Sequence, residues 1–263
     1  MSKQIFFLSG MFRCGTNLLR SIMNQNPDFY VSPNSFLPEV FQLLHRTKET
    51  SQYKDWKRLD IDINFKDNEK YYDDIIKNTF NNYYSSYKQK YIMDQARWGA
   101  PGNFRLLMYY NFLPKKFVIL VRPFEDILKS WIRYYKIPNY RVSKFCDEQM
   151  MEHGAMGQGI LALETLLEHH KDNLKIISYD SLCNKPKETI AELYEFLNIP
   201  LYKHKFKNFS QVDTSGIKPS IIRTNKVEKI NYKDDIIISN KVLQKYSKQI
   251  NLLKNLLEVK HEI

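Results

Sequence analysis

The chain has 263 residues, of which 43% are hydrophobic and 14% aromatic, and its formal net charge is +11. A chain of this size buries a core large enough to fold without disulfides or metal, and its composition is that of a globular rather than a disordered protein. The positive charge attracts anions, but the lysines are spread along the whole chain, which favours a solvated basic surface over a nucleic-acid groove. We expect one domain over residues 1–263.

The three cysteines, Cys14, Cys146 and Cys183, are widely scattered and odd in number, so they predict neither a disulfide framework nor a metal site. The histidines have no partners at ligand spacing, and we therefore predict no metal. The apolar run before Gly10 is too short for the apolar region of a signal peptide or for a membrane span. We expect a cytoplasmic protein without membrane association.

Short apolar runs alternate with helical patterns along the first half of the chain. Residues 3–8 read as a buried strand that leads into a turn, and a helix follows with apolar residues at helical spacing over 18–23. The next expected elements are helices over 37–44, 71–87 and 104–110, a loop over 51–68 and a strand over 91–93.

The clearest strand is Phe117–Val121, whose continuous apolar run predicts burial on both faces. Pro123 follows, and an apolar stripe from Phe124 to Tyr135 predicts an amphipathic helix. The remaining expected elements are a strand over 174–179, a helix over 187–197 and a C-terminal helix from about residue 241. This alternation predicts an α/β fold: a central parallel sheet flanked by helices, of the P-loop-containing nucleotide-binding type. Its ligands bind at the carboxyl edge of the strands.

The segment over 9–19 follows a strand and opens a helix, so its backbone amides and the helix dipole favour a bound anion. Gly10 and Gly15 have the separation found in the phosphate loop of nucleoside triphosphatases. However, Thr16 stands where that loop has Lys, and Asn17 stands where it has the hydroxyl that binds magnesium. The sequence therefore disfavours magnesium-dependent phosphoryl transfer.

Arg13 supplies a cation to this loop from a different position. The stretch from Arg13 to Asn17 resembles the 5′-phosphosulfate-binding loop of the sulfotransferase family, in which a basic residue precedes Ser, Gly, Thr and Thr or similar residues. The resemblance implies that the donor is 3′-phosphoadenosine 5′-phosphosulfate and that Arg13 contacts its phosphosulfate bridge. It also implies that the loop amides hold the 5′-phosphate, together with Cys14, Gly15, Thr16 and Asn17. Cys14 replaces the usual Ser and Asn17 the usual second Thr.

Three further stretches resemble the same family. Arg122 follows a strand and Ser130 lies eight positions later, as in the family's 3′-phosphate pattern. Tyr179 lies in a stretch that resembles the family's Tyr-Glu-Asp-Leu strand exit, which implies a place beside the adenine or the 3′-phosphate. Lys218 and Arg223 stand where family members carry a basic loop that closes over the nucleotide.

The resemblance is nearest to the tyrosylprotein and carbohydrate sulfotransferases. In the tyrosylprotein branch a Glu after the first helix is the general base, but the corresponding position is Asn34, which cannot accept the proton. Two carboxylates remain as candidates: Glu39 and Asp94. We place Asp94 ahead, because a strand exit at the active edge points its side chains at the ligand. Arg97 is the candidate for a second cation that steadies the transferring sulfonate.

The sequence thus predicts an enzyme that transfers a sulfuryl group from 3′-phosphoadenosine 5′-phosphosulfate to a hydroxyl or amine of unknown identity, on a small molecule, carbohydrate or peptide. One alternative is a nucleotide or nucleoside kinase of related fold, which would depend on magnesium. Another is a basic, non-enzymatic nucleic-acid-binding protein, whose binding would weaken steeply with salt. The ordered pair of phosphate signatures favours the enzyme, and we expect no nucleic-acid partner.

Overall fold

A computed structural model describes residues 3–9, 11–33, 35–50, 65–113, 115–208, 227 and 236–258. Its centre is a five-stranded sheet whose neighbouring strands are all parallel, in the order β2-β3-β1-β4-β5. The strands are β1 Gln4–Leu8, β2 Phe29–Val31, β3 Tyr91–Gln95, β4 Phe117–Val121 and β5 Leu174–Ser178. This architecture confirms the predicted α/β fold with a central parallel sheet.

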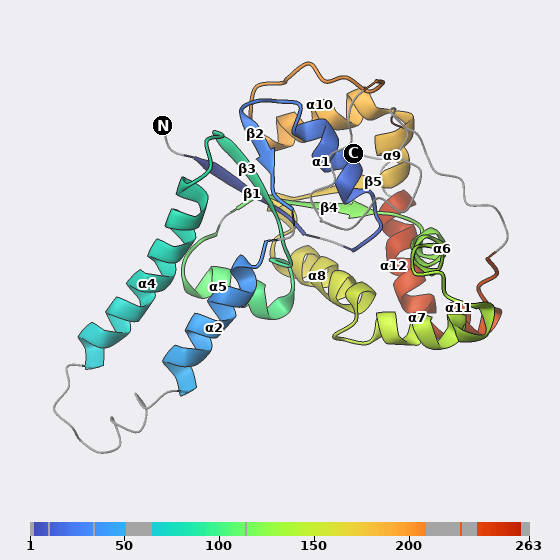
Figure 1. Ribbon diagram of the computed structural model, residues 1–263, viewed down its shortest axis with the longest axis horizontal. Coiled ribbons are helices and arrows are strands. Elements are labelled where there is room, and N and C mark those ends of the chain that lie inside the picture. Colours follow the sequence, from blue (N-terminus) through green and yellow to red (C-terminus); the bar gives the residue numbers. More distant parts are fainter. Residues whose placement is uncertain are drawn as a thin grey trace.

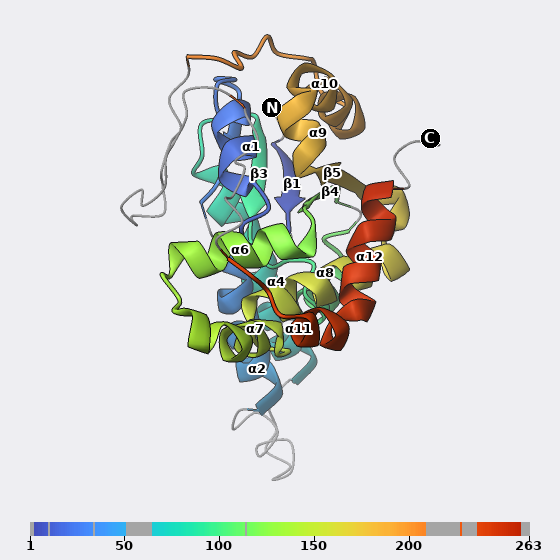
Figure 2. The same ribbon diagram turned by 90° about the vertical axis from the view of Figure 1, so that its right-hand side faces the viewer.

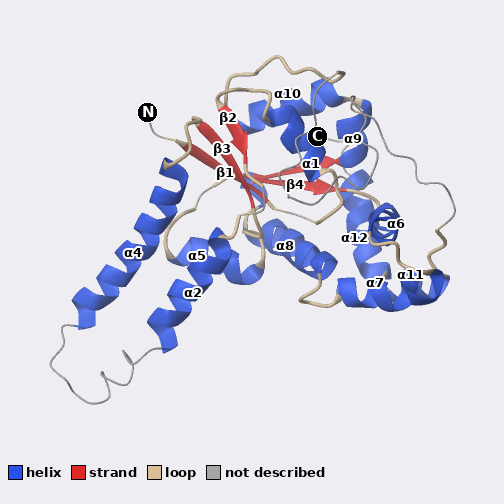
Figure 3. Cartoon of the chain, in the orientation of Figure 1, coloured by secondary structure: helices blue, strands red, loops and turns tan. Residues whose placement is uncertain are grey.

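Helices connect the strands and cover the sheet (Figure 3). They are α1 Thr16–Met23, α2 Leu37–Thr50, α4 Phe65–Ser85, α5 Pro101–Tyr109, α6 Phe124–Tyr134, α7 Val142–Met150, α8 Ala155–His169, α9 Tyr179–Asn184, α10 Pro186–Leu197, α11 Asn240–Lys245 and α12 Ser247–Glu258. Helices α1, α9 and α10 lie on one side of the sheet, and α8 and α12 lie on the other (Figures 1 and 2). Helices α2 and α4 extend away from the sheet and contact each other (Figure 1).

The centre of the core is built from the inner strands β1 and β4 and the rings packed on them. All five residues of β4 are buried, as expected for an inner strand covered on both faces. In β1, the Phe7 ring lies 5.3 Å from that of Trp98 and 5.0 Å from that of Phe117. Each large apolar side chain buried in this way contributes about 1.5–3 kcal/mol to stability.

Strands β1 and β4 lie side by side, joined by a backbone hydrogen bond of 3.0 Å from Ser9 N to the Val118 oxygen. The chain leaves β1 toward β2 and leaves β4 toward β5, which lie on opposite sides of this pair. The loops that follow β1 and β4 therefore diverge at the carboxyl edge of the sheet. Such a switch point is where open α/β sheets bind their ligands.

The structure departs from the sequence predictions at several elements. The predicted loop over 51–68 is helical from Phe65 onward, and 51–64 lies outside the described residues. Strand β2 and helix α7 were not anticipated. Tyr135, placed on the buried stripe of α6, is exposed just after the helix ends. Tyr179 begins α9 rather than ending β5, and the C-terminal helix is divided at Tyr246.

His204 packs among aromatic rings beyond α10, and its Nε2 lies 2.9 Å from the Tyr194 hydroxyl. Burial lowers the pKa of His204 to about 4. Burial disfavours the protonated imidazole in the folded protein but not in the unfolded chain. The contribution of His204 to the free energy of unfolding is therefore fully present above about pH 6.5, the ordinary pKa of His, and is lost as the pH falls toward 4.

We expect the free energy of unfolding to fall from pH 7 to pH 4.5 more steeply in the wild type than in His204→Gln, whose amide does not titrate. Urea denaturation at both pH values measures this difference. His153→Gln, at an exposed position, is the control and should keep the wild-type slope. Equal slopes for wild type and His204→Gln would contradict the prediction.

Candidate active site

The loop after β1 has a backbone conformation that few residues adopt easily. Arg13 has a φ angle of 65° and Gly15 one of 95°, both in the left-handed region. Gly15 is the N-cap of α1 and makes no side-chain cap, so the first amides of the helix are open to an outside acceptor. The loop and the start of α1, where Thr16 is half-buried and Asn17 exposed, therefore have a geometry that favours a bound anion.

Gly15 also contacts the ring of Tyr179, the first residue of α9. A Cβ atom added to Gly15 would lie 2.5 Å from Tyr179 Cδ2, so only glycine permits this approach. The backbone conformation and the contact with Tyr179 thus require the same residue. The stretch that resembles the phosphosulfate-binding loop and the stretch that contains Tyr179 therefore meet at this point.

Arg122 lies between the end of β4 and the start of α6, with its side chain 3% exposed. Its guanidinium carbon lies 4.4 Å from the ring centroid of Tyr179. Its Nε forms an ion pair of 3.5 Å with Asp126, one turn into α6. Tyr179 therefore touches both Gly15 and Arg122, which joins the two predicted phosphate positions.

Ser130 is buried in α6, with 1% of its surface exposed, and is not a solvent-facing helix position. Arg13 Nε donates a hydrogen bond of 3.0 Å to Ser130 Oγ. The Arg13 guanidinium carbon also lies 4.7 Å from the ring centroid of Tyr134. Tyr134 was not among the site residues predicted from the sequence. It follows Ser130 by four residues and so lies on the same face of α6.

Cys14 is fully buried in this loop, and burial raises the pKa of its thiol to about 12, although nearby Arg122 acts in the opposite direction. The thiol is therefore neutral at physiological pH. A neutral, buried thiol is a poor nucleophile, so Cys14 has the environment of a packing residue.

Arg97 lies just beyond β3 and is exposed. Its guanidinium carbon lies 5.3 Å from the ring centroid of Phe12, which belongs to the loop after β1. The ring of Phe12 in turn lies 6.1 Å from that of Trp131 on α6. The structure thus places the candidate second cation beside the loop after β1.

Asp94 is completely buried at the end of β3. Its Oδ1 accepts a hydrogen bond of 2.7 Å from Ser32, and its Oδ2 accepts one from Tyr84 and one from Trp98, each also 2.7 Å. Burial raises the pKa of this carboxyl, while the donated hydrogen bonds act against that rise. The carboxylate ties β2, α4 and the turn after β3 together, which is a structural arrangement that sequence spacing did not reveal.

Glu39 is exposed in the first turn of α2, which follows the exit of β2. The other four positions named from the sequence, Gly10, Asn34, Lys218 and Arg223, lie outside the described residues. The structure therefore forms two sets of contacts, Arg13 with Ser130 and Tyr179 with Gly15 and Arg122. The loop backbone from Arg13 to Gly15 links the two sets into one group. The structure leaves Glu39 and Asp94 without a contact to that group among the residues described.

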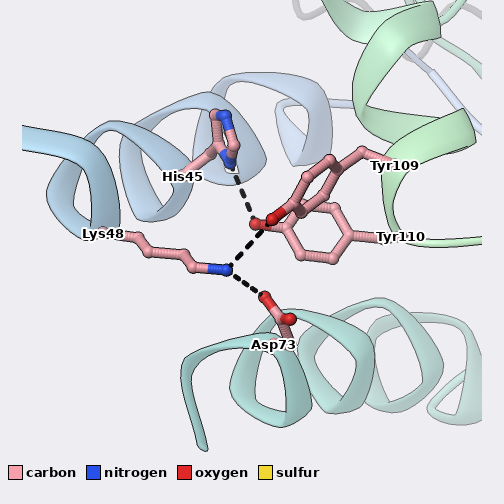
Figure 4. A network of polar contacts seen from close by, with 5 residues as sticks. All are labelled: His45, Lys48, Asp73, Tyr109 and Tyr110. Atoms are coloured by element: carbon pink, nitrogen blue, oxygen red, sulfur yellow. Dashed lines mark hydrogen bonds and ion pairs between the residues drawn. The ribbon is translucent and has the colours of Figure 1, made fainter. Parts of the chain in front are cut away.

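A polar network fixes the helix that carries Glu39 (Figure 4). Lys48 near the end of α2 contacts Asp73 of α4 at 2.7 Å and the Tyr109 hydroxyl of α5 at 3.3 Å. His45 Nδ1 lies 3.0 Å from the hydroxyl of Tyr110. Burial alone would lower the pKa of Lys48, but its hydrogen bonds to Asp73 and Tyr109 raise that pKa above its ordinary value. The network holds α2 against its two neighbours through a charged lysine.

Two features are absent from the described residues, a membrane-spanning helix and a cluster of metal ligands. No helix in these ranges is long and apolar enough to cross a membrane. No group of three or more His, Cys, Asp or Glu side chains in the same ranges is arranged to hold a metal ion.

The sequence matches a family model described as the sulfotransferase family over residues 5–203. The match spans the loop after β1, the Arg122 position, Ser130 and Tyr179. Because it covers well over half of the chain, the chain belongs to the sulfotransferase family, and the protein is an enzyme that moves a sulfuryl group to an acceptor. Family membership thus supports the enzyme over the kinase and the non-enzymatic alternatives.

Solved structures show the same fold. One is a sulfotransferase domain from the olefin synthase of Synechococcus PCC 7002, with a TM-score of 0.56 and 14% identity, covering 95% of this chain and 96% of that one. A sulfotransferase from Alicyclobacillus acidocaldarius has a TM-score of 0.54 and 13% identity, covering 98% and 96%. A sulfotransferase domain from the curacin biosynthetic pathway has a TM-score of 0.51 and 15% identity, covering 95% and 98%. A comparison with curated proteins finds no match.

The contact between Gly15 and Tyr179 gives a direct prediction. Gly15→Ala places a side chain in a left-handed conformation, which costs about 1–2 kcal/mol, and also pushes it into the ring. We expect the melting temperature to fall by several degrees and anion binding at the loop to weaken. Thermal unfolding monitored by circular dichroism measures the change.

Gly102→Ala is the matched control, because the nearest atom to its added Cβ lies 3.9 Å away and the position is helical. This variant should be as stable as the wild type or more stable. A Gly15→Ala protein as stable as the wild type would contradict the close contact.

Proposed function

We propose that this sulfotransferase takes its sulfuryl group from 3′-phosphoadenosine 5′-phosphosulfate. The observation that carries the proposal is the connected group at the carboxyl edge of the sheet. Arg13 reaches Ser130, while Gly15 and Arg122 both touch Tyr179. A donor with phosphates at its 5′ and 3′ positions fits two cationic positions held by one group of contacts.

The residues present fit such a donor. The loop backbone before α1, with Thr16 and Asn17 behind it, would hold the 5′-phosphate, because open amides at a helix start favour anions. Arg122 and Ser130 would hold the 3′-phosphate, with Arg supplying charge and Ser a directed hydrogen bond. Tyr179 would lie beside the adenosine, since it already touches both positions.

When bound, the donor supplies a sulfuryl group, whose bond to the 5′-phosphate oxygen breaks as the acceptor oxygen or nitrogen attacks sulfur. Arg13 would neutralise the charge that builds on the departing phosphate. Arg97, beside Phe12, would steady the sulfonate oxygens. A carboxylate would take the proton that the acceptor loses.

Of the two candidate bases, Glu39 has the better access. Asp94 has no exposed surface, and its two oxygens already accept three hydrogen bonds. A base must come within hydrogen-bond reach of the acceptor's proton. Glu39 is exposed at the start of α2, whose position is fixed by the Lys48 network. We therefore assign the role of general base to Glu39. Asp94 has a structural role, since its hydrogen bonds link the ends of β2 and β3 to α4.

The acceptor is proposed to be a hydroxyl or amine of a small molecule, carbohydrate or peptide, and not a nucleic acid. Lys218 and Arg223 are proposed to close over the nucleotide as a basic loop. The single domain over 1–263, the cytoplasmic location and the absence of metal also stay predictions of the sequence. The assignment of the donor is independent of all of them.

The two phosphate positions predict how ligands stabilise the protein. We expect 3′-phosphoadenosine 5′-phosphate to raise the melting temperature without magnesium, and AMP, which lacks the 3′-phosphate, to raise it much less. Arg122→Ala should weaken binding of the 3′-phosphorylated ligand by about 10- to 100-fold, the loss of one charged hydrogen-bonded contact. The affinity for AMP should stay nearly unchanged. Thermal shift and titration calorimetry measure both effects.

Lys144→Ala is the control for loss of one positive charge, because its side chain on α7 is 74% exposed. It should bind both ligands as the wild type does. Equal stabilisation of the wild type by both ligands would rule out the role given to Arg122 and Ser130.

The assignment of the base gives a kinetic prediction once an acceptor has been found with labelled donor. Glu39→Gln should lower kcat by roughly 10²- to 10⁴-fold, the usual contribution of a general base, and leave binding of the desulfated donor product unchanged. Asp94→Asn should instead lower the melting temperature, because an amide nitrogen replaces an acceptor of buried hydrogen bonds. Arg13→Ala should lose both rate and donor affinity.

Glu188→Gln is the matched control, because Glu188 is also an exposed third residue of a helix, α10. It should leave kcat unchanged. Full turnover in Glu39→Gln with a loss in a folded Asp94→Asn would reverse the assignment. Full turnover in both would mean that neither carboxylate is the base.

A further inference from the structure

Arg13 makes two contacts with α6, and both come from the same face of that helix. Its Nε donates to Ser130 Oγ at 3.0 Å, and its guanidinium carbon lies 4.7 Å from the centroid of the Tyr134 ring. Ser130 and Tyr134 are four residues apart, so their side chains lie one above the other. The guanidinium is thus held at one edge by a hydroxyl and on one face by an aromatic ring.

These two contacts leave the remaining edge of the guanidinium available. An arginine side chain has five N–H donors in one plane, and the bond to Ser130 uses the one on Nε. A ring under the face attracts the cation without accepting any of the in-plane donors. Neither contact therefore uses the terminal nitrogens, and the ring restricts where the guanidinium can lie.

The backbone at Arg13 is also unfavourable. Its φ angle of 65° lies in the left-handed region, which costs free energy for a residue with a side chain, so contacts with the surroundings must offset that cost. No carboxylate in the described ranges forms an ion pair with Arg13. The contacts from α6 are therefore the ones that orient it.

We propose that Tyr134 is a positioning residue for sulfuryl transfer: its ring sets the plane of the Arg13 guanidinium at the bond that breaks. The inference rests on the proposed donor and extends it to a residue that the motifs do not include. A lysine at position 13 would have no plane to orient, so the role of Tyr134 is tied to the arginine found in this chain.

Neighbouring rings show that Tyr134 is not simply a core residue. It is the half-buried last residue of α6, and its ring contacts that of Tyr135 at 4.9 Å. Tyr135 is more exposed and packs on Trp131 and Phe145, without a contact to Arg13 among the described residues. Tyr135 is therefore a matched control of the same residue type at the adjacent position.

The test uses release of labelled sulfate from 3′-phosphoadenosine 5′-phosphosulfate by the full-length protein, which needs no acceptor. Tyr134→Leu should lower the release rate at saturating donor by about 3- to 30-fold, the range expected for a lost cation–π contact. Its melting temperature should stay within a few degrees of the wild type. Tyr134→Phe, which keeps the ring, should restore most of the rate, and Tyr135→Leu should release sulfate at the wild-type rate.

A double-mutant cycle with Arg13→Lys distinguishes positioning from a general structural effect. The Tyr134→Leu change should lower the rate much less in the Arg13→Lys background, because the planar group that the ring supports is absent. An equal loss in both backgrounds, or no loss in Tyr134→Leu, would overturn the role of Tyr134 while leaving the proposed donor intact. A wild type that neither binds nor turns over this donor would overturn both proposals.

Discussion

The contacts of the Tyr179 ring are the constraint on which the rest of the site depends. The ring touches the backbone of Gly15, after β1, and the guanidinium of Arg122, after β4. Tyr179 itself begins α9 directly after β5, where Ser178 Oγ accepts a hydrogen bond from Ser181 N. Three loops that are distant in the sequence are therefore fixed relative to one another by one side chain. The spacing between the two cationic positions follows from this contact rather than from either loop alone.

The elements that the sequence predicted are those whose signal is local. β4 can be recognised from its own residues because it is buried on both faces and its sequence is continuously apolar. α6 can be recognised because one face is buried and apolar residues recur at helical spacing. The start of helix α8 has no such local signal, because its first turns contain Gly157 and Gly159, which lower helix propensity. A Cβ at Gly157 would lie 2.0 Å from the Met151 oxygen, and one at Gly159 would lie 2.5 Å from Met11 Cγ. Tertiary packing selected these glycines against the local preference.

The same distinction separates the parts of the site that the sequence reveals from those that it does not. Residues in the loops that follow strands, such as Arg13 and Arg122, are recognisable because the topology of a parallel sheet places these loops at one edge. Asp94 also ends a strand, but its side chain is buried by Ser32, Tyr84 and Trp98, which come from different parts of the chain. The direction in which a strand-end side chain points depends on such partners. Sequence position therefore predicted the edge correctly and could not predict the access of each carboxylate.

The three arginines of the site share one physical feature: each guanidinium lies over an aromatic ring. Arg13 lies over Tyr134, Arg97 over Phe12 and Arg122 over Tyr179. A carboxylate partner would neutralise most of the positive charge, whereas a ring face orients the cation and leaves its charge and in-plane donors in place.

Arg122 also has a carboxylate nearby, but its Nε lies 3.5 Å from Asp126, a longer separation than that of a strong charge-assisted hydrogen bond. The three arginines are therefore held in an ordered arrangement at this edge of the sheet before any ligand arrives. That arrangement would attract the proposed anionic donor, and guanidinium groups already held in place would need less reorganisation when negative charge moves onto its departing phosphate. Aromatic support of the arginines thus links the packing of the fold to the chemistry of sulfuryl transfer.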